Sequence, residues 1–135
     1  MVCKFLFHRY RLMIHVHSIR IRTKESENNL RVVSADDPTL LRVCEQCVRL
    51  GYPLIIENVG ETIESSLLPL LDRDLFKRKT SAVLTVRFND VDIEFHPNFR
   101  LYLITQLNNP HFLPDICIRV TLSKFFDRHK QFVLT

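Results

Sequence analysis

The feature that most constrains the fold is an uninterrupted apolar run, Leu-Ile-Ile at 54–56, which a carboxylate and an amide follow at Glu57 and Asn58. A strand with one solvated face alternates apolar and polar residues, whereas a strand buried on both faces is continuously apolar. The run therefore predicts an interior strand of a parallel sheet. Ligands collect at the carboxyl ends of such strands, so Glu57 and Asn58 occupy the expected position of a site.

The residues before this strand predict a strand-helix-strand unit. Residues 30–33 are mostly apolar and β-branched, as is typical of a strand. Ser34 and Asp37 match the Ser-x-x-Asp signal that begins a helix. We expect this helix to run to Leu50, because Gly51 suits a left-handed cap.

The later residues add a helix and an antiparallel unit. Leucines at helical spacing predict a second amphipathic helix over 64–76, and residues 82–95 alternate around Asn89 and Asp90, as expected of a β-hairpin. Residues 99–107 predict one more strand. The fold class is therefore α/β, with three layers, a mostly parallel sheet and an inserted β-hairpin.

Composition narrows the class of protein. The 135 residues are 46% hydrophobic, which suits one domain with a real core, and the formal charge of +4 is spread along the chain. Exposed aromatic residues do not interleave these bases, so we predict no nucleic-acid partner. No apolar run approaches the roughly 20 residues of a membrane span. Four cysteines without a leader sequence favour a reduced, intracellular protein.

The polar residues after the apolar strand admit several interpretations. ATP-hydrolysing P-loop proteins place an acidic pair at this point to hold magnesium and activate water. Here Glu57 is followed by Asn58, and an amide cannot accept the proton of an attacking water. Capping of the next helix and residual ligand contact both stay open for Glu57, Asn58 and Glu61. We predict no catalytic residue.

The loop that cradles phosphate is missing from the sequence. A Gly-x-x-x-x-Gly-Lys-Ser/Thr loop works because consecutive backbone amides close on phosphate oxygens. Gly51 and Gly60 are the two glycines of the chain, and neither begins such a motif. We therefore expect no nucleotide bound by this chain in the ordinary mode.

Other polar residues give weaker signals. Cys44 and Cys47 admit a zinc or redox interpretation, but they lie on the apolar face of the expected helix, so burial as small hydrophobic residues is favoured and no metal site is predicted. His96 and His111 fit loops. Arg119 is either a solvated surface cation or an arginine that reaches a phosphate in a neighbouring module.

Three motifs carry a resemblance to a known family. They are Leu-Ile-Ile-Glu-Asn-Val-Gly-Glu at 54–61, Asp-Ile-Glu-Phe-His-Pro-Asn-Phe-Arg-Leu-Tyr at 92–102 and Asn-Pro-His-Phe-Leu-Pro-Asp-Ile-Cys-Ile-Arg-Val-Thr-Leu at 109–122. In this order they resemble the fifth AAA-type module of the dynein heavy-chain motor ring, in its axonemal rather than its cytoplasmic form. The resemblance covers residues 21–122.

The resemblance implies roles for single residues. Glu57 and Asn58 would occupy a degenerate Walker B position, Thr105 the sensor-like strand end, and Arg119 the arginine facing the nucleotide of the preceding module. It implies a structural, non-hydrolysing module in a motor that moves toward microtubule minus ends. This segment would bind no cofactor, and ATP and magnesium would be bound by neighbouring modules.

The resemblance also implies partners and a location. The partners would be neighbouring AAA-type modules of the same heavy chain, the intermediate and light chains, and, indirectly, microtubules. The location would be the cytoplasm and cytoskeleton, in the axoneme of a cilium or flagellum.

The two ends depart from the family pattern. Residues 1–20 and 123–135 diverge, so residues 21–122 form the expected core and the chain resembles a truncated module. The shortened start predicts a sheet that lacks its first strand and helix, although residues 12–16 suit a strand. Two alternatives stay open: a small free-standing basic interaction protein without nucleotide chemistry, and a zinc or redox module.

Overall fold

The main sheet is parallel and lies between helical layers. A computed structural model of the chain describes residues 3–8, 21–105, 114 and 121–125. Every neighbouring pair of main-sheet strands is parallel. The strands are β1 (Cys3–His8), β2 (Arg31–Ser34), β3 (Leu54–Glu57), β7 (Leu101–Thr105) and β8 (Thr121–Phe125), in the spatial order β2-β3-β7-β1-β8.

Strand β3 confirms the prediction from its apolar run. It pairs with β2 on one side and β7 on the other, and Leu54, Ile55 and Ile56 are at most 1% exposed. A strand with sheet neighbours at both edges and packing on both faces has no solvated side, so apolar residues need not alternate with polar ones.

Strand β1 corrects the expectation of a missing first strand. It lies between β7 and β8 in the interior of the sheet, although no strand was predicted at Cys3–His8. The segment contains Phe5 and Phe7 in alternation, which favours a strand, but a lysine and a histidine break the continuous apolar run that is typical of an interior parallel strand. The strand suggested at residues 12–16 lies outside the described residues.

Helix α2 (Leu40–Leu50) ends where the sequence predicts and begins later. Gly51 has φ of 74° and its N–H donates to Cys47 O, as a left-handed cap requires. The predicted start was too early, because Thr39 is the residue before the helix. The Asp37 Oδ1 accepts from both the backbone N and the Oγ1 of Thr39, at 2.8 and 2.7 Å, and this local turn occupies the residues ahead of the helix.

The second predicted helix, over 64–76, was too long. A 3-10 turn, η2 (Ser65–Leu67), leads into α3 (Leu68–Asp72), and Arg73 in the left-handed region with φ of 52° ends the helix. The following residues form β4 (Leu75–Lys77), which pairs antiparallel with β5 (Leu84–Phe88). Pairing with a distant strand therefore overrides the helical spacing of these apolar residues.

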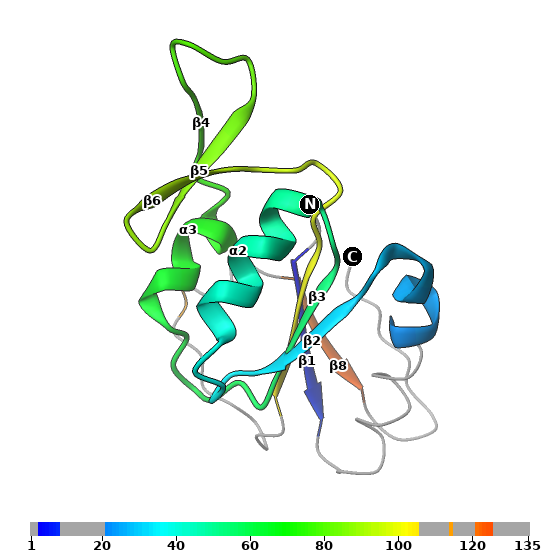
Figure 1. Ribbon diagram of the computed structural model, residues 1–135. Coiled ribbons are helices and arrows are strands. Elements are labelled where there is room, and N and C mark those ends of the chain that lie inside the picture. Colours follow the sequence, from blue (N-terminus) through cyan, green and yellow to red (C-terminus); the bar gives the residue numbers. More distant parts are fainter. Residues whose placement is uncertain (1–2, 9–20, 106–113, 115–120, 126–135) are drawn as a thin grey trace.

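The hairpin prediction is confirmed. Strands β5 and β6 (Val91–Glu94) pair antiparallel across Asn89 and Asp90, whose φ angles are 49° and 62°. Positive φ at both central residues is the geometry that matches the twist of a tight hairpin. With β4 this makes a second, three-stranded sheet, which projects from the body of the molecule (Figure 1).

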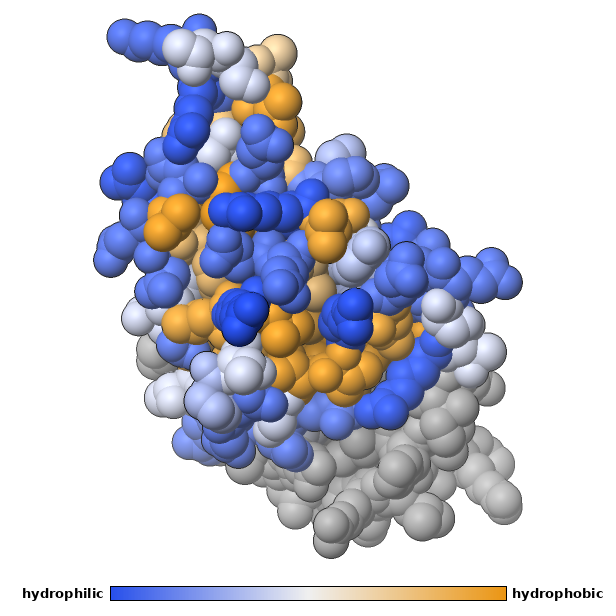
Figure 2. Space-filling model, viewed as in Figure 1, coloured by the Kyte–Doolittle hydropathy of each residue, from blue (hydrophilic) through white to orange (hydrophobic). Residues whose placement is uncertain are grey.

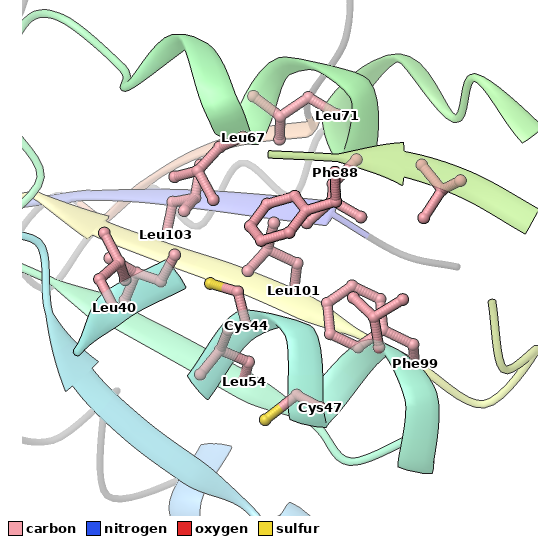
Figure 3. Packing of buried hydrophobic residues seen from close by; sticks show 14 of the residues in the cluster. Leu40, Cys44, Cys47, Leu54, Leu67, Leu71, Phe88, Phe99, Leu101 and Leu103 are labelled. Carbon is pink, nitrogen blue, oxygen red and sulfur yellow. The ribbon is translucent and has the colours of Figure 1, made fainter. Parts of the chain in front are cut away.

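Helices α2 and α3 cover one face of the main sheet, and the helical segment of residues 21–28 lies on the other side (Figure 1). A large apolar core fills the space between the sheet and the two helices. Cys44 and Cys47 both belong to it, and Cys44 lies beside Leu54 and Leu101 (Figure 3). On the opposite face, Ile55, Tyr102 and Ile104 pack against Ile21 and Leu30. The α/β class with an inserted hairpin is thus confirmed.

Candidate functional site

The predicted site lies at the carboxyl rim, where β2, β3 and β7 end. In register, Ser34 pairs with Glu57, and Thr105 is the last residue of β7. The backbone N of Val59, in the loop after β3, donates to Ile104 O at 3.0 Å. The sheet therefore brings Glu57, Asn58 and Thr105 to one rim, as the sequence predicts for the ends of parallel strands.

The Glu57 carboxylate has a cation of the same chain beside it. Arg22 Nη2 lies 2.8 Å from Glu57 Oε1, and the two side chains are 48% and 31% exposed. Arg22 comes from the helical residues 21–25 on the second face of the sheet. Ion pairs with this exposure contribute about 0–1 kcal/mol to stability, so the main effect of the contact is on the local charge at the rim.

Asn58 turns the chain away from the strand. Its φ is 57°, in the left-handed region that asparagine tolerates better than most residues. Its Nδ2 donates to Ser34 Oγ at 3.4 Å. The capping interpretation of Glu57, Asn58 and Glu61 was wrong, because Glu64 is the N-cap residue of the next helical turn.

Thr105 is fully buried, with 0% of its surface exposed. Its Oγ1 donates to Val59 O at 2.6 Å. A hydroxyl has one hydrogen to donate, so in this arrangement the Thr105 hydrogen is used by the backbone of the loop that follows β3. Together with the bond from Val59 N to Ile104 O, this contact holds the ends of β3 and β7 together.

The remaining predicted residues lie apart from this rim or outside the described residues. Arg119 and His111 lie outside the described residues. Glu61 is exposed in the loop after β3. His96 lies in the connection from β6 to β7, where its N donates to Val48 O and its Nδ1 accepts from Asn98 N, which confirms the loop interpretation.

The cysteine pair is part of the core. Cys44 and Cys47 are 0% and 1% exposed, so their predicted burial is confirmed. Burial raises the pKa of the Cys44 thiol to about 12 and that of Cys47 to about 11. Zinc binding and redox exchange both use the thiolate, which these values disfavour. Within the described residues, no group of three or more His, Cys, Asp or Glu side chains is arranged to hold a metal ion.

A buried carboxylate at Glu25 was not predicted. It is 0% exposed and accepts hydrogen bonds from Arg100 Nη1 at 2.8 Å, Tyr102 Oη at 2.9 Å and Asn28 Nδ2 at 2.9 Å. Burial by itself would raise the pKa of Glu25, but the bonds from Asn28, Tyr102 and Arg100 outweigh it and lower that pKa. The alternation of Arg100 and Tyr102 could have indicated an acidic partner, because residues i and i+2 of a strand share a face.

Glu25 also borders a hollow at the opposite end of the strands from Glu57. The hollow has a volume of about 380 Å³. Pro53 and Arg100, which directly precede β3 and β7, lie on its wall with Glu25 and Glu27. It is therefore separate from the rim that the sequence predicts as the site.

Comparison with known proteins identifies the family. Residues 8–130 match the family described as the ATP-binding dynein motor region. The chain belongs to this family. As a member of the dynein motor region it carries an AAA-type domain, which agrees with its parallel sheet and inserted hairpin.

Several curated dynein heavy chains are similar to this dynein chain. Human dynein axonemal heavy chain 6 is 39% identical over 105 residues, covering 78% of this chain. The dynein alpha chain of the flagellar outer arm of Chlamydomonas reinhardtii is 40% identical over 105 residues, again 78% of this chain. Human dynein axonemal heavy chain 3 is 36% identical over 120 residues, or 87%.

The dynein chain spans a small part of these relatives. The matched residues make up 2% of the first two heavy chains and 3% of the third. The resemblance to axonemal dynein heavy chains is thereby confirmed, whereas its assignment to the fifth module stays a prediction. None of the helices in the part of the chain that the structure describes is long and apolar enough to cross a membrane.

Proposed function

We propose that the chain is the fifth AAA-type module of a dynein heavy-chain motor ring and that it supports the ring without hydrolysing ATP. The observation that carries this proposal is the carboxyl rim. There Arg22 pairs with Glu57, Asn58 stands where a second acid would be needed, and the Thr105 hydroxyl donates to Val59 O.

The residues at the rim do not fit magnesium-bound ATP. Magnesium is held by carboxylate oxygens, and at Glu57 one carboxylate oxygen is paired with the Arg22 guanidinium, which the cation would have to displace. A general base must accept a proton from water, and the amide of Asn58 cannot. A sensor hydroxyl must direct its hydrogen toward the ligand, while that of Thr105 is donated to a backbone carbonyl.

The two glycines of the sequence support the same conclusion. Gly51 ends α2 with a positive φ, and Gly60 follows β3. Neither lies between a strand and a helix with a lysine at the spacing that phosphate binding requires. ATP and magnesium are therefore assigned to neighbouring modules of the heavy chain, and this chain binds no cofactor.

The module would act through its neighbours. We propose that its partners are the adjacent AAA-type modules, the intermediate and light chains, and microtubules indirectly, in the axoneme of a cilium or flagellum. The axonemal names of the most similar relatives support this location. Arg119, outside the described residues, stays a proposed arginine finger that would reach the nucleotide of the preceding module.

A chimeric motor tests the absence of hydrolysis. This chain would replace the matching segment of a recombinant axonemal dynein heavy chain, and Glu57→Gln would then be introduced. Loss of the carboxylate stops turnover at a hydrolysing module. At a non-hydrolysing one we expect the ATP turnover of the motor to change less than twofold.

The control in the same motor is Arg119→Gln. Because an arginine finger contributes a factor of about 10³ or more to turnover at the neighbouring nucleotide, this change should slow turnover at least tenfold. A tenfold loss with Glu57→Gln would contradict the non-hydrolysing role. A chimera with no motor activity beside an active parent would favour the free-standing interaction protein.

A further inference from the structure

The loop between β4 and β5 lies at the tip of the projecting hairpin sheet (Figure 1). Strand pairing ends at Lys77 and Leu84, so residues 78–83 lie beyond the last paired residues. All of them are exposed except Ser81, which is partly exposed. In the space-filling view, hydrophilic and apolar surfaces lie side by side at this tip (Figure 2).

The sequence of this loop places three bases directly before two hydroxyl groups. It reads Lys-Arg-Lys-Thr-Ser-Ala-Val from Lys77 to Val83. Protein kinases that select basic substrates use acidic side chains to pair with bases two and three residues before the acceptor, and this charge pattern provides much of their specificity. Arg78 and Lys79 have those positions relative to Ser81.

We propose that Ser81 is a phosphorylation site for a protein kinase of this basic-substrate class. The proposal depends on the accessibility of the loop and the order of its charges, and it does not depend on the role of the chain in a motor ring.

The structure favours Ser81 over the neighbouring Thr80. A kinase binds its substrate as an extended segment, so the residues from three before the acceptor to about two after it must leave the fold. For Ser81 these are residues 78–83, all outside the strand ladder. For Thr80 they would include Lys77, which is paired with Leu84 in the β4–β5 ladder.

Apart from the exposed ion pair of Arg78 with Asp92, little local structure has to open. Ser81 N donates to Arg78 O at 3.2 Å, and Val83 N donates to Ser81 Oγ at 3.2 Å. Both bonds are long within the usual range for N–H···O contacts. Loops with few buried contacts open at low free-energy cost, so residues 78–83 can extend while the hairpin sheet stays paired.

The chemistry is an ordinary phosphoryl transfer. The Ser81 Oγ would attack the γ-phosphorus of magnesium-bound ATP, the bond to ADP would break, and the hydroxyl proton would pass to an aspartate of the kinase. The phosphoserine carries a charge of about −1.5 to −2 at pH 7. That charge would offset about half to two thirds of the positive charge of Lys77, Arg78 and Lys79.

The new phosphate would also compete for Arg78. Its Nη2 now lies 3.2 Å from Asp92 Oδ2, while Arg87 Nε lies 2.9 Å from the other carboxylate oxygen of Asp92. Phosphate is a stronger partner for a guanidinium than an exposed carboxylate. We therefore expect Arg78 to turn toward Ser81 after modification while Arg87 keeps its contact with Asp92.

The test is phosphorylation of the 135-residue chain in vitro. The purified chain would be incubated with magnesium-bound ATP and the catalytic subunit of cAMP-dependent protein kinase, and the modified residue located by fragmentation mass spectrometry. We expect phosphate on Ser81. Ser81→Ala and Arg78→Gln should each reduce the initial rate of incorporation at least tenfold.

Arg87→Gln is the matched control, because Arg87 also contacts Asp92 but follows the acceptor in the sequence. The phosphorylation rate of this variant should stay within twofold of that of the parent chain.

A synthetic peptide of residues 75–86 gives the phosphorylation rate of the same sequence without the folded structure. The folded chain should react within about tenfold of the peptide rate. Phosphate mainly on Thr80, or a folded chain more than a hundredfold slower than the peptide, would overturn the proposal.

Discussion

Glu25 shows at the scale of one residue what a buried charge requires. Transfer of an ionised carboxylate from water to the protein interior is very costly unless hydrogen bonds replace its hydration. Here Arg100, Tyr102 and Asn28 supply three donors, two of them to Oε1. The donors come from β7, from the residue before it and from η1 (Ser26–Asn28), so the carboxylate fixes the helical segment to the sheet.

Tyr102→Phe tests the buried hydrogen bond from the Tyr102 hydroxyl to the Glu25 carboxylate. The substitution removes a donor from Glu25 while keeping the aromatic ring that packs on Ile55. Hydrogen bonds to charged groups contribute about 1.5–3 kcal/mol, and the bonds from Arg100 and Asn28 persist. We expect a loss of about 1–2 kcal/mol in the free energy of unfolding, measured by urea denaturation.

Tyr52→Phe is the control for the loss of a phenol. Tyr52 packs against the edge of the main core, and within the described residues its hydroxyl has no hydrogen-bond partner. Its removal should change the free energy of unfolding by less than about 0.5 kcal/mol. Equal effects of the two substitutions would show that the bond to Glu25 contributes nothing specific.

At the scale of elements, the end of α2 depends on the absence of a side chain. Gly51 has φ of 74°, and a Cβ there would collide with the imidazole of His96. His96 is held in place because its N donates to Val48 O and its Nδ1 accepts from Asn98 N. The helix end and the connection from β6 to β7 therefore determine each other's position.

Gly51→Ala should destabilise the protein by about 2 kcal/mol or more, since left-handed backbone costs a residue with a Cβ about 1–2 kcal/mol and the collision adds to it. Thermal or urea unfolding measures the effect. Gly60→Ala is the matched control, because no atom lies within 4 Å of the position of its Cβ. A loss below about 0.5 kcal/mol for Gly51→Ala would contradict this account.

Local patterns predicted most elements, and long-range pairing explains the exceptions. The apolar run of β3, the cap at Gly51 and the turn at Asn89 are properties of neighbouring residues, and each prediction is confirmed. The apolar residues Leu75 and Phe76 fit the spacing of a helix and that of a strand equally well. They form β4 because β5 is available to pair with them, which a local pattern cannot reveal.

The same distinction applies to the candidate site. The position of Glu57 at the rim could be predicted from the apolar strand that ends there. Its partner Arg22, however, is 35 residues away in sequence. The contacts of Glu25 with Arg100 and Tyr102 span 75 and 77 residues. Charges at such separations can be matched only when the fold is known, so the residues of the site were predictable and their electrostatic state was not.

At the scale of the whole molecule, residues 21–30 connect the two ends of the sheet. Arg22 contacts Glu57 at the carboxyl rim, and Glu25 contacts Arg100 just before β7 begins. Ile21 and Leu30, which flank these contacts in the sequence, pack on the second face of the sheet. The segment therefore shields apolar surface that would otherwise favour association.

The stability of this arrangement should depend on pH. Because the pKa of Glu25 is lowered in the folded state from its ordinary value of 4.5, the unfolded chain binds this proton more tightly. The stabilisation is fully present above about pH 4.5 and is lost as the pH falls through the lower folded-state pKa. The exposed carboxyls of Asp37 and Asp92 also have lowered pKa values and act in the same direction.

Glu25→Gln separates the contribution of Glu25 from theirs. At pH 7 the parent chain should be more stable than the variant by about 1–3 kcal/mol, because an ionised acceptor is exchanged for a neutral one. That difference should shrink steadily between pH 4.5 and pH 2.5, when urea denaturation is repeated across the range. For the exposed Glu61→Gln the difference should stay below about 0.5 kcal/mol at every pH. A difference for Glu25→Gln that stayed constant down to pH 2.5 would mean that its carboxylate is not the charged, hydrogen-bonded group that holds the helical segment on the sheet.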